Sequence, residues 1–390
     1  MVDLKKEIKL SDLVRRPKKS KPARNGASAA RPAKRANAKK KQELVGLKIG
    51  ASQIAAALVV NNGSTPRLVQ LARRPLEPGI VVAGEVRDVP ALAAALESFF
   101  TDNKLPRKGI RLGIGTNRIG VRSLDVEGID DVRQLGNAVR FRAHEALAIP
   151  MDEAVLDYHV TGETVTESGG ISRRVLLAAA YREPIDHYIE AFRSARLELV
   201  GIDVEAFALL RAVAPTRAAD PDAAPSAVVA VALGHDRSTL AISDGTVCDF
   251  MRVLEWGGGK LDAAISRALG LTLEEASEVK NQLSLEADAD PDPRIARARS
   301  AVLAELETLA RELVASLQFY QSEPGSLPIA EILVTGGTSQ LPGLPEELER
   351  LIRARVRAAD PLAGVRAEPG AAGRDDLASL AVAIGLGVEQ

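Results

Sequence analysis

The chain has 390 residues, of which 46% are hydrophobic and 26% are charged, a composition typical of a globular protein with two or more domains. Its single cysteine excludes an internal disulfide and suits a reducing compartment, and its four histidines lack metal-ligand spacing, which argues against a zinc site. The sequence has no apolar run long enough to span a bilayer and no signal-peptide pattern at its start. The net charge of −1 conceals a division, because residues 1–42 carry 15 basic and 3 acidic residues, whereas the remainder carries 36 basic and 49 acidic residues.

Residues 1–43 are expected to be a basic, disordered tail. Leu4, Ile8 and a group of aliphatic residues after them fit one side of a short amphipathic helix, and the rest is Lys, Arg, Ala and Pro without periodicity. Such a tail could be a solubilising extension, or it could contact anionic lipid, dock on a partner or bind nucleic acid loosely. We expect no sequence-specific nucleic-acid recognition, because the tail lacks aromatic residues, zinc ligands and a helix-turn-helix pattern.

Two strands joined by a tight turn follow the tail. The alternation at 45–49 and the apolar run at 54–60 predict the strands, and Gly50, Ala51 and Ser52 lie between them. This turn leaves amide N–H groups and one hydroxyl pointing the same way, which is a suitable place for a phosphate. A glycine between two strands is nevertheless most often an ordinary hairpin, so the turn needs support from elsewhere in the chain.

The next elements indicate a small domain inserted into a larger one. A strand at 120–126, a helix at 130–147 and strands at 155–161 and 174–181 form a compact α+β group at 120–181. A stretch rich in Ala, Asp and Pro at 217–225 then predicts a link between two halves of the chain. Around the insertion, the patterns predict strands at 68–74, 110–114 and 197–204, helices at 88–101, 184–195 and 207–213, and a loop at 75–87.

The opening pattern recurs after the link. Strands at 227–233 and 239–242 flank Gly234, which predicts an internal repeat of the first hairpin. Three glycines at 257–259 open a helical region, and a buried strand at 329–334 is followed by the sequence TGGT at 335–338. The remaining patterns predict a strand at 247–254 and helices at 261–269, 272–282, 296–320, 344–353 and 377–387.

This series of motifs resembles the actin-like ATPase superfamily and, within it, the PilM family of type IV pilus assembly proteins, relatives of the division protein FtsA. The resemblance covers about residues 45–388. It is carried by VGLKIGASQI at 45–54, LVQLARRPLEPGIVVAGEVRDVPAL at 68–92, AVRFRAHEALAIPMDEAVLDYHV at 138–160, VLLAAAYREPIDHYIEAFRSARLELVGIDVEAFALLRA at 175–212, WGGGKLDAAISRALGLTLEEASEVK at 256–280 and ILVTGGTSQLPGL at 332–344.

The resemblance implies an α/β fold, an actin-like (ASKHA) two-lobe nucleotide clamp. The first lobe would comprise residues 44–119 and 182–215 and carry the small α+β domain at 120–181. The second lobe would comprise 226–390, with a helical subdomain at about 257–325, and ATP would lie between the lobes. By position, the residues expected to bind it are Gly50, Ser52 and Gln53 on one side of the phosphates, Gly234, Ser238 and Thr239 on the other, and Lys280, Gly336, Gly337 and Thr338 around the nucleoside.

Two departures from the family pattern bear on activity. The family's two phosphate turns each begin with an aspartate, and this chain has Lys48 and Ala232 at those positions. Such aspartates organise Mg²⁺ and its waters, which an alanine cannot do and a lysine opposes. Lys48 could instead neutralise phosphate charge directly, or be a surface residue at a strand edge. A third departure is Ser277, which stands where the family has an acid three residues before the lysine. We therefore expect slow or absent hydrolysis, with nucleotide binding that is weaker and depends less on Mg²⁺.

The resemblance implies a cytoplasmic scaffold at the inner face of the cell membrane. Family members bind the cytoplasmic tail of the membrane protein PilN in a groove between the first lobe and the inserted domain, and so connect indirectly to the pilus motor ATPases. Nucleotide state would set lobe closure and hence partner affinity. The alternatives are an active phosphotransferase or chaperone-type ATPase, which the missing aspartates disfavour, and an FtsA-like membrane-associated polymer, whose amphipathic helix would be C-terminal rather than N-terminal.

Overall fold

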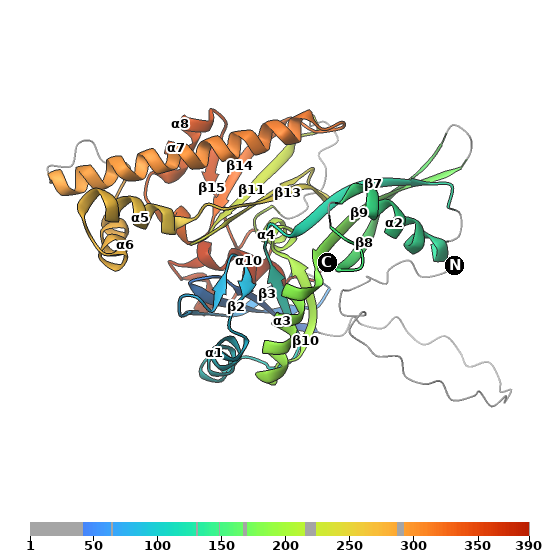
Figure 1. Ribbon diagram of the computed structural model, residues 1–390, viewed down its shortest axis with the longest axis horizontal. Coiled ribbons are helices and arrows are strands. Elements are labelled where there is room, and N and C mark those ends of the chain that lie inside the picture. Colours follow the sequence, from blue (N-terminus) through green and yellow to red (C-terminus); the bar gives the residue numbers. More distant parts are fainter. Residues whose placement is uncertain are drawn as a thin grey trace.

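A computed structural model describes residues 42–63, 65–129, 132–147, 149–166, 170–214, 224–286 and 292–389. Two mixed sheets lie face to face with two helices between them, and a smaller sheet projects to one side (Figure 1). Nearly all of the predicted basic tail lies outside the described residues, as does most of the predicted link at 217–225. Gln42 and Glu43, which the sequence assigned to the tail, instead begin the first strand.

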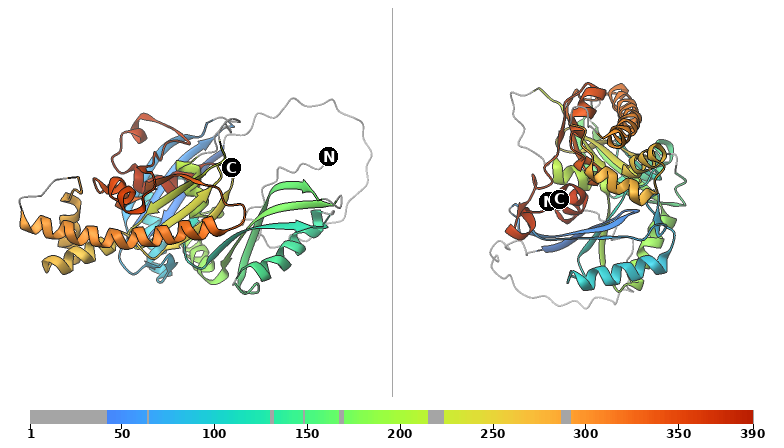
Figure 2. Two further views of the ribbon diagram at one scale, coloured as in Figure 1. Left: turned by 90° about the horizontal axis from the view of Figure 1, so that it is seen from above. Right: turned by 90° about the vertical axis from the view of Figure 1, so that its left-hand side faces the viewer.

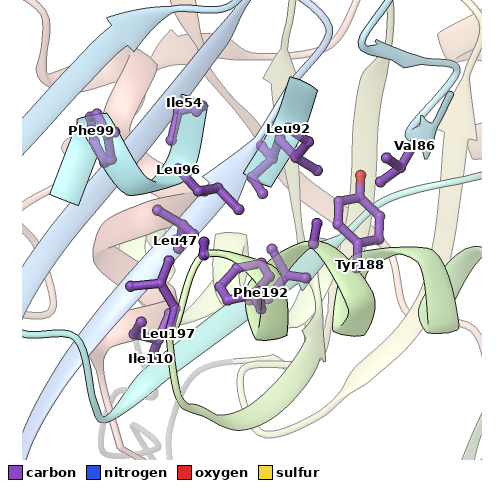
Figure 3. Packing of buried hydrophobic residues seen from close by; sticks show 14 of the residues in the cluster. Leu47, Ile54, Val86, Leu92, Leu96, Phe99, Ile110, Tyr188, Phe192 and Leu197 are labelled. Carbon is purple, nitrogen blue, oxygen red and sulfur yellow. The ribbon is translucent and has the colours of Figure 1, made fainter. Parts of the chain in front are cut away.

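The first sheet has six strands in the order β10-β6-β1-β2-β3-β16. The predicted first hairpin is its centre, since β1 and β2 are antiparallel, and β1, β6 and β10 run parallel to one another. Helices α1 and α3 cover one face through a large aliphatic and aromatic core (Figure 3). The elements are β1 (Gln42–Ile49), β2 (Gln53–Asn61), β3 (Arg67–Pro75), β6 (Ile110–Ile114), β10 (Leu199–Val204), β16 (Arg366–Ala367), α1 (Val89–Asp102) and α3 (Arg182–Ser194).

The second sheet repeats this plan with five strands in the order β13-β12-β11-β14-β15. Strands β11 and β12 form the predicted second hairpin, and β14 runs parallel to β11. Its outer face carries the long helix α7 with α5 and α8, which share one core. The elements are β11 (Ala227–Leu233), β12 (Ser238–Ser243), β13 (Cys248–Leu254), β14 (Ile329–Thr335), β15 (Val356–Ala358), α5 (Gly258–Leu269), α6 (Leu273–Gln282), α7 (Pro293–Ser322) and α8 (Leu344–Ile352).

Two buried helices fill the space between the sheets and connect them. α4 (Glu205–Val213) follows the first sheet in sequence but packs on β11 and β12, whereas α10 (Leu377–Gly387) follows the second sheet but packs on β1 and β2. The two helices also pack directly on each other, with Gly385 so close that an added Cβ would lie 1.8 Å from the carbonyl oxygen of Ala208. Each half of the chain therefore completes the core of the other half.

The third sheet stands apart from the other two. Strands β7 (Ile119–Glu127), β9 (Ile171–Tyr181) and β8 (Ala154–Val165) form an antiparallel sheet that packs helix α2 (Val132–Ala146) on one face (Figure 2). Strand β7 also contacts β13 of the second sheet. Within the described part of this unit, Phe141 and Val165 are large apolar side chains exposed to solvent, at 68% and 77%.

Several short elements were not predicted from the sequence. Residues 75–87, expected to be a loop, contain the two-stranded pair β4 (Val81–Val82) and β5 (Glu85–Val86). Strands β15 and β16 and the one-turn helix α9 (Pro369–Ala372) were also not predicted. Segments of two to four residues are too short to show the period of a strand or helix, so their pairing partners decide their structure.

Candidate functional site

An open hollow lies between the two large sheets. It is formed where the parallel strands β1, β6 and β10 of one sheet and β11 and β14 of the other reach their carboxyl ends, the usual position for ligands in such sheets. The lining residues are Lys48 to Gln53, Gly84, Gly115, Glu205, Ala232, Gly234 to Arg237, Thr239, Gly336, Gly337, Ala378, Ser379, Ala381 and Val382.

The two predicted phosphate turns have the same geometry and face this hollow from opposite sheets. In the first, the N–H of Gly50 donates to the carbonyl oxygen of Gln53 at 2.9 Å; in the second, Gly234 N–H donates to the carbonyl oxygen of Arg237 at 3.0 Å. The predicted internal repeat is therefore confirmed. Of the ten predicted binding residues, the hollow brings together Gly50, Ser52, Gln53, Gly234, Thr239, Gly336 and Gly337.

Glycines allow the second turn to lie directly on its neighbours. The N–H groups of Gly258 and Gly259, at the start of α5, donate to the carbonyl oxygens of Gly234 and His235, each at 2.8 Å. A Cβ on Gly257 would lie 2.3 Å from the His235 oxygen, and one on Gly336 (φ +94°) would lie 2.3 Å from the carbonyl oxygen of Leu233. Glycine is thus required at both positions by close backbone approach beneath the turn.

The other three predicted residues do not line the hollow. Ser238 is buried and donates to the carbonyl oxygen of Trp256 at 2.7 Å, while the hydroxyl of Thr338 donates to the carbonyl oxygen of Gly234 at 2.9 Å. Both side chains thereby support the second turn. Lys280 forms a 2.7 Å ion pair with the buried Asp262 of α5. The carboxylate beside Lys280 is thus supplied by another helix.

Lys48 is not a free surface residue at a strand edge. Its Nζ forms an ion pair with Oε2 of Glu205 at 2.9 Å, and the Glu205 side chain is only 8% exposed. Glu205 begins α4, directly after the carboxyl end of β10. An added Cβ on Gly115 would lie 2.9 Å from Oε2 of Glu205, so glycine is needed for the carboxylate to reach this position. The pair places one lysine and one carboxylate side by side in the hollow.

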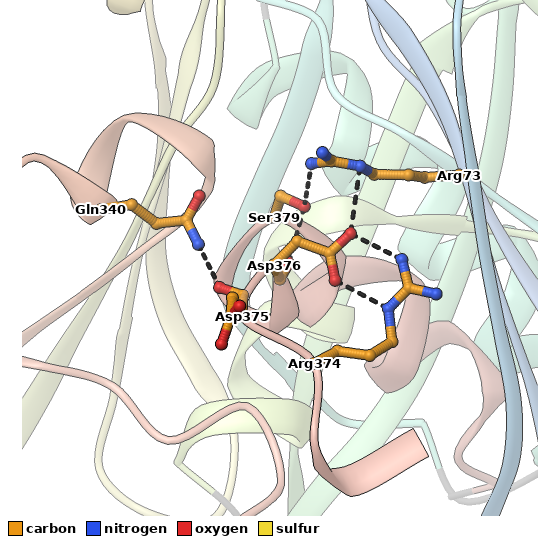
Figure 4. Close-up of polar contacts among 6 residues, drawn as sticks. All are labelled: Arg73, Gln340, Arg374, Asp375, Asp376 and Ser379. Carbon is orange, nitrogen blue, oxygen red and sulfur yellow. Dashed lines mark hydrogen bonds and ion pairs between the residues drawn. The ribbon is translucent and has the colours of Figure 1, made fainter. Parts of the chain in front are cut away.

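The N-terminus of α10 forms one wall of the hollow and is held by arginines (Figure 4). Asp376 accepts two hydrogen bonds from Arg374, at 2.7 and 2.6 Å, and a contact of 3.0 Å from Arg73 of β3. The Arg374 bonds lower the pKa of Asp376, so this carboxyl stays ionised. The cluster ties the second half of the chain to the first sheet beside Ser379, which lines the hollow.

The hollow offers Mg²⁺ few free oxygen ligands. Of the two carboxylates that line it, Glu205 is already paired with Lys48, and Asp236 lies 3.9 Å from Arg237 with its side chain 36% exposed. A magnesium ion is held by oxygen ligands in near-octahedral geometry, usually with one or two carboxylates free to bind it or its waters. Throughout the part of the chain that the structure describes, no group of three or more His, Cys, Asp and Glu residues could hold a metal ion.

A second, smaller hollow lies where the third sheet joins the first. Its floor is apolar, and the guanidinium of Arg118 lies over the ring of Tyr181 at 4.1 Å from the centroid and forms a 3.2 Å ion pair with Glu85. Gly84 lines both hollows. The lining residues of the second hollow are Gly84, Ile114, Thr116, Arg118, Ile119, Ala180, Tyr181, Pro184, Ile185 and Tyr188.

Sequence reasoning missed Glu205, Arg237 and Gly84. Glu205 follows a predicted strand and Arg237 lies in a polar turn, and Lys48, the partner of Glu205, is distant in sequence. Gly84 lay in a segment that was expected to be a loop. The one available signal was the position of Glu205 at the carboxyl end of a predicted strand, where ligand-binding residues gather in parallel sheets.

The sequence matches the protein family described as type IV pilus assembly protein PilM over residues 46–390. The chain belongs to the PilM family. A solved PilM–PilN type IV pilus biogenesis complex is 26% identical, with a TM-score of 0.72 over 88% of this chain and 97% of that one. The family assignment that the sequence motifs suggested is therefore confirmed.

More distant similarities confirm the actin-like fold of this PilM-family chain. The ethanolamine utilization protein EutJ from Carboxydothermus hydrogenoformans is 15% identical, with a TM-score of 0.50 over 90% of this chain and 91% of that one. MreB5 of Spiroplasma citri bound to ADP is 13% identical, with a TM-score of 0.50 over 88% of this chain and 94% of that one. In the described residues of this chain, no helix is both long and apolar enough to cross a membrane.

Proposed function

We propose that the chain is a cytoplasmic scaffold of a type IV pilus assembly machine, at the inner face of the cell membrane, that binds the cytoplasmic segment of a PilN-like membrane protein and connects indirectly to the motor ATPases. The observation that carries this proposal is the similarity, over 88% of the chain, to a PilM subunit solved in complex with PilN. The working division is the one expected from the sequence: two lobes, an inserted domain at 120–181 and a helical subdomain at about 257–325.

The second hollow is the proposed site for the PilN-like peptide. It has an apolar floor and lies between the first sheet and the third sheet. Arg118 at its edge offers a cation to an acidic residue or carbonyl of the peptide. An extended peptide with apolar side chains, spaced to enter the hollow, would suit this surface.

Replacement of Arg118 tests the groove. Arg118→Ala removes the contact with Tyr181 and the ion pair with Glu85, and should weaken binding of a synthetic peptide of the cognate PilN cytoplasmic segment by about tenfold in calorimetry. The matched control is Arg122→Ala on β7, the strand that follows Arg118; Arg122 does not line the hollow, and its loss should change the affinity by less than twofold. Equal effects of the two substitutions would place the peptide elsewhere.

The larger hollow is the proposed nucleotide site, with ATP as a regulatory ligand that is hydrolysed slowly or not at all. Support comes from the two matching turns, the glycines around them and the pairing of Glu205, one of the two carboxylates that line the hollow, with Lys48. Equilibrium binding of fluorescent ATP, with Mg²⁺ or with EDTA, and phosphate release test this. Binding without release is expected, whereas Mg²⁺-dependent turnover would contradict it.

Nucleotide and peptide binding are proposed to be coupled through Gly84. This residue lines both hollows, and its carbonyl oxygen accepts a 3.2 Å hydrogen bond from the hydroxyl of Tyr188, whose side chain lines the peptide hollow. A nucleotide that moves the segment around Gly84 changes peptide affinity only to the extent that it binds the two conformations of the chain with different affinity.

Contact of the basic tail with anionic lipid is a separate part of the proposal, and vesicle co-sedimentation with and without residues 1–41 tests it.

A further inference from the structure

Arg237 ends the second turn and carries a charge without a strong partner. Its side chain is 11% exposed, and its nearby carboxylate, Asp236, is 3.9 Å away, at the limit of an ion pair. Its Nη1 atom is buried and has no hydrogen-bond partner among the residues that the structure describes. Leaving a buried donor unpaired is costly, and the cost is greater for a charged group. A bound anion that accepts a hydrogen bond from Nη1 would account for this arrangement.

The guanidinium spans the hollow rather than lying along one wall. Arg237 belongs to the second sheet's hairpin, yet a Cβ added to Gly84, on the first-sheet side, would lie 3.4 Å from Nη1. The other basic side chains that line the hollow are His235 and Lys48, and Lys48 is already paired with Glu205. Of these basic side chains, Arg237 therefore combines a fixed charge with an unused donor.

We propose that Arg237 binds the phosphates of the nucleotide directly and supplies the positive charge that a divalent cation would otherwise supply. A guanidinium is always ionised, and its planar donors match two oxygens of a phosphate. The ligand class is a nucleoside triphosphate or another polyphosphate held by the two turns. Asp236 would repel such a ligand, but its side chain is 36% exposed and can turn to solvent. This inference rests on the proposed nucleotide-binding function.

The test is equilibrium titration of fluorescent ATP into the full chain in EDTA, with inorganic triphosphate as a competitor. Arg237→Gln should weaken ATP and triphosphate at least tenfold, and Arg237→Lys should bind with intermediate affinity because it keeps the charge but loses the fork. Arg311→Gln is the matched control, since it removes the same charge from an exposed position on α7 and should change the affinity by less than twofold.

Thermal unfolding separates ligand binding from a structural role. Without ligand, Arg237→Gln should be as stable as the wild type or more stable, because the substitution removes an unsatisfied buried cation, and it should lose the rise in Tm that ATP causes in the wild type. A large loss of Tm in the ligand-free variant would assign Arg237 a structural role and overturn the proposal.

Three further results would overturn it: unchanged ATP affinity in Arg237→Gln, a wild type that binds ATP only with Mg²⁺, and a wild type that binds neither ATP nor triphosphate. Peptide binding, measured on the same samples, keeps the two proposals distinct. If the peptide binds normally and Arg237→Gln does not change the affinity for ATP, the proposed scaffold function stands. Peptide unbound would contradict the scaffold function whatever Arg237 does.

Discussion

At the scale of single residues, Lys48 stands where the family has an aspartate, and its charge is balanced by the buried carboxylate of Glu205. The carboxylate of Glu205 is nearly inaccessible, so loss of Lys48 would leave a buried charge without its partner. We expect Lys48→Ala to lower the free energy of unfolding by about 2 kcal/mol, less than a fully buried pair would give because Lys48 itself is partly exposed. Urea denaturation measures the difference.

An exposed ion pair on the surface supplies the control for Lys48→Ala. Lys108 pairs with Glu198 at 3.4 Å, and both side chains are largely exposed. Lys108→Ala should therefore cost no more than about 0.5 kcal/mol. The double variant Lys48→Ala, Glu205→Ala should be more stable than Lys48→Ala alone, since no charge remains buried. If Lys48→Ala costs no more than Lys108→Ala, Glu205 is not held by this pair.

At the scale of elements, the crossed packing of α4 and α10 determines how the lobes are joined. Gly385→Ala would place a Cβ 1.8 Å from the Ala208 carbonyl oxygen, and because that oxygen belongs to the backbone of a packed helix, the helices must separate. We expect a loss of about 3 kcal/mol or more, measured by chemical denaturation. In Gly201→Ala on β10, the added Cβ would have no atom within 4 Å apart from those of its chain neighbours, so the free energy of unfolding should change by less than about 1 kcal/mol. Similar behaviour of the two variants would contradict the close packing.

Most elements, but only part of the site, could be predicted from the sequence. The two turns were found because a glycine between apolar strands is a local signal, and Gly50 and Gly234 both line the hollow. Glu205 and Lys48 are 157 residues apart, so no local pattern connects them. Lys280 was predicted to lie at the nucleoside, and its ion pair with Asp262 on a neighbouring helix was not foreseen. Such pairings depend on which helices pack together, which a single sequence does not display.

At the scale of the whole molecule, the contact between the third sheet and the second sheet includes a carboxyl group, that of Asp249, whose pKa is shifted. Burial, with a smaller contribution from Asp244, raises the pKa of Asp249 on β13 from 3.8 to about 6, and Arg174 on β9 opposes the shift. Between these two values Asp249 binds more protons in the folded chain than in the unfolded chain, so its contribution to stability should fall as pH rises from about 4 to about 6.

Asp249→Asn should remove this dependence and, above pH 6, stabilise the fold by roughly 1 kcal/mol, a value discounted because solvent reaches the carboxyl. Denaturation midpoints from pH 4 to 8 measure the effect, and Asp186→Asn, at an exposed position on α3, is the control. Because Arg174 also bonds Asp125 of β7, ionised Asp249 competes for a guanidinium that already has a partner within its own sheet. A wild type whose stability rises from pH 4 to 6 in parallel with Asp249→Asn would show that this contact between the sheets does not set the pH response.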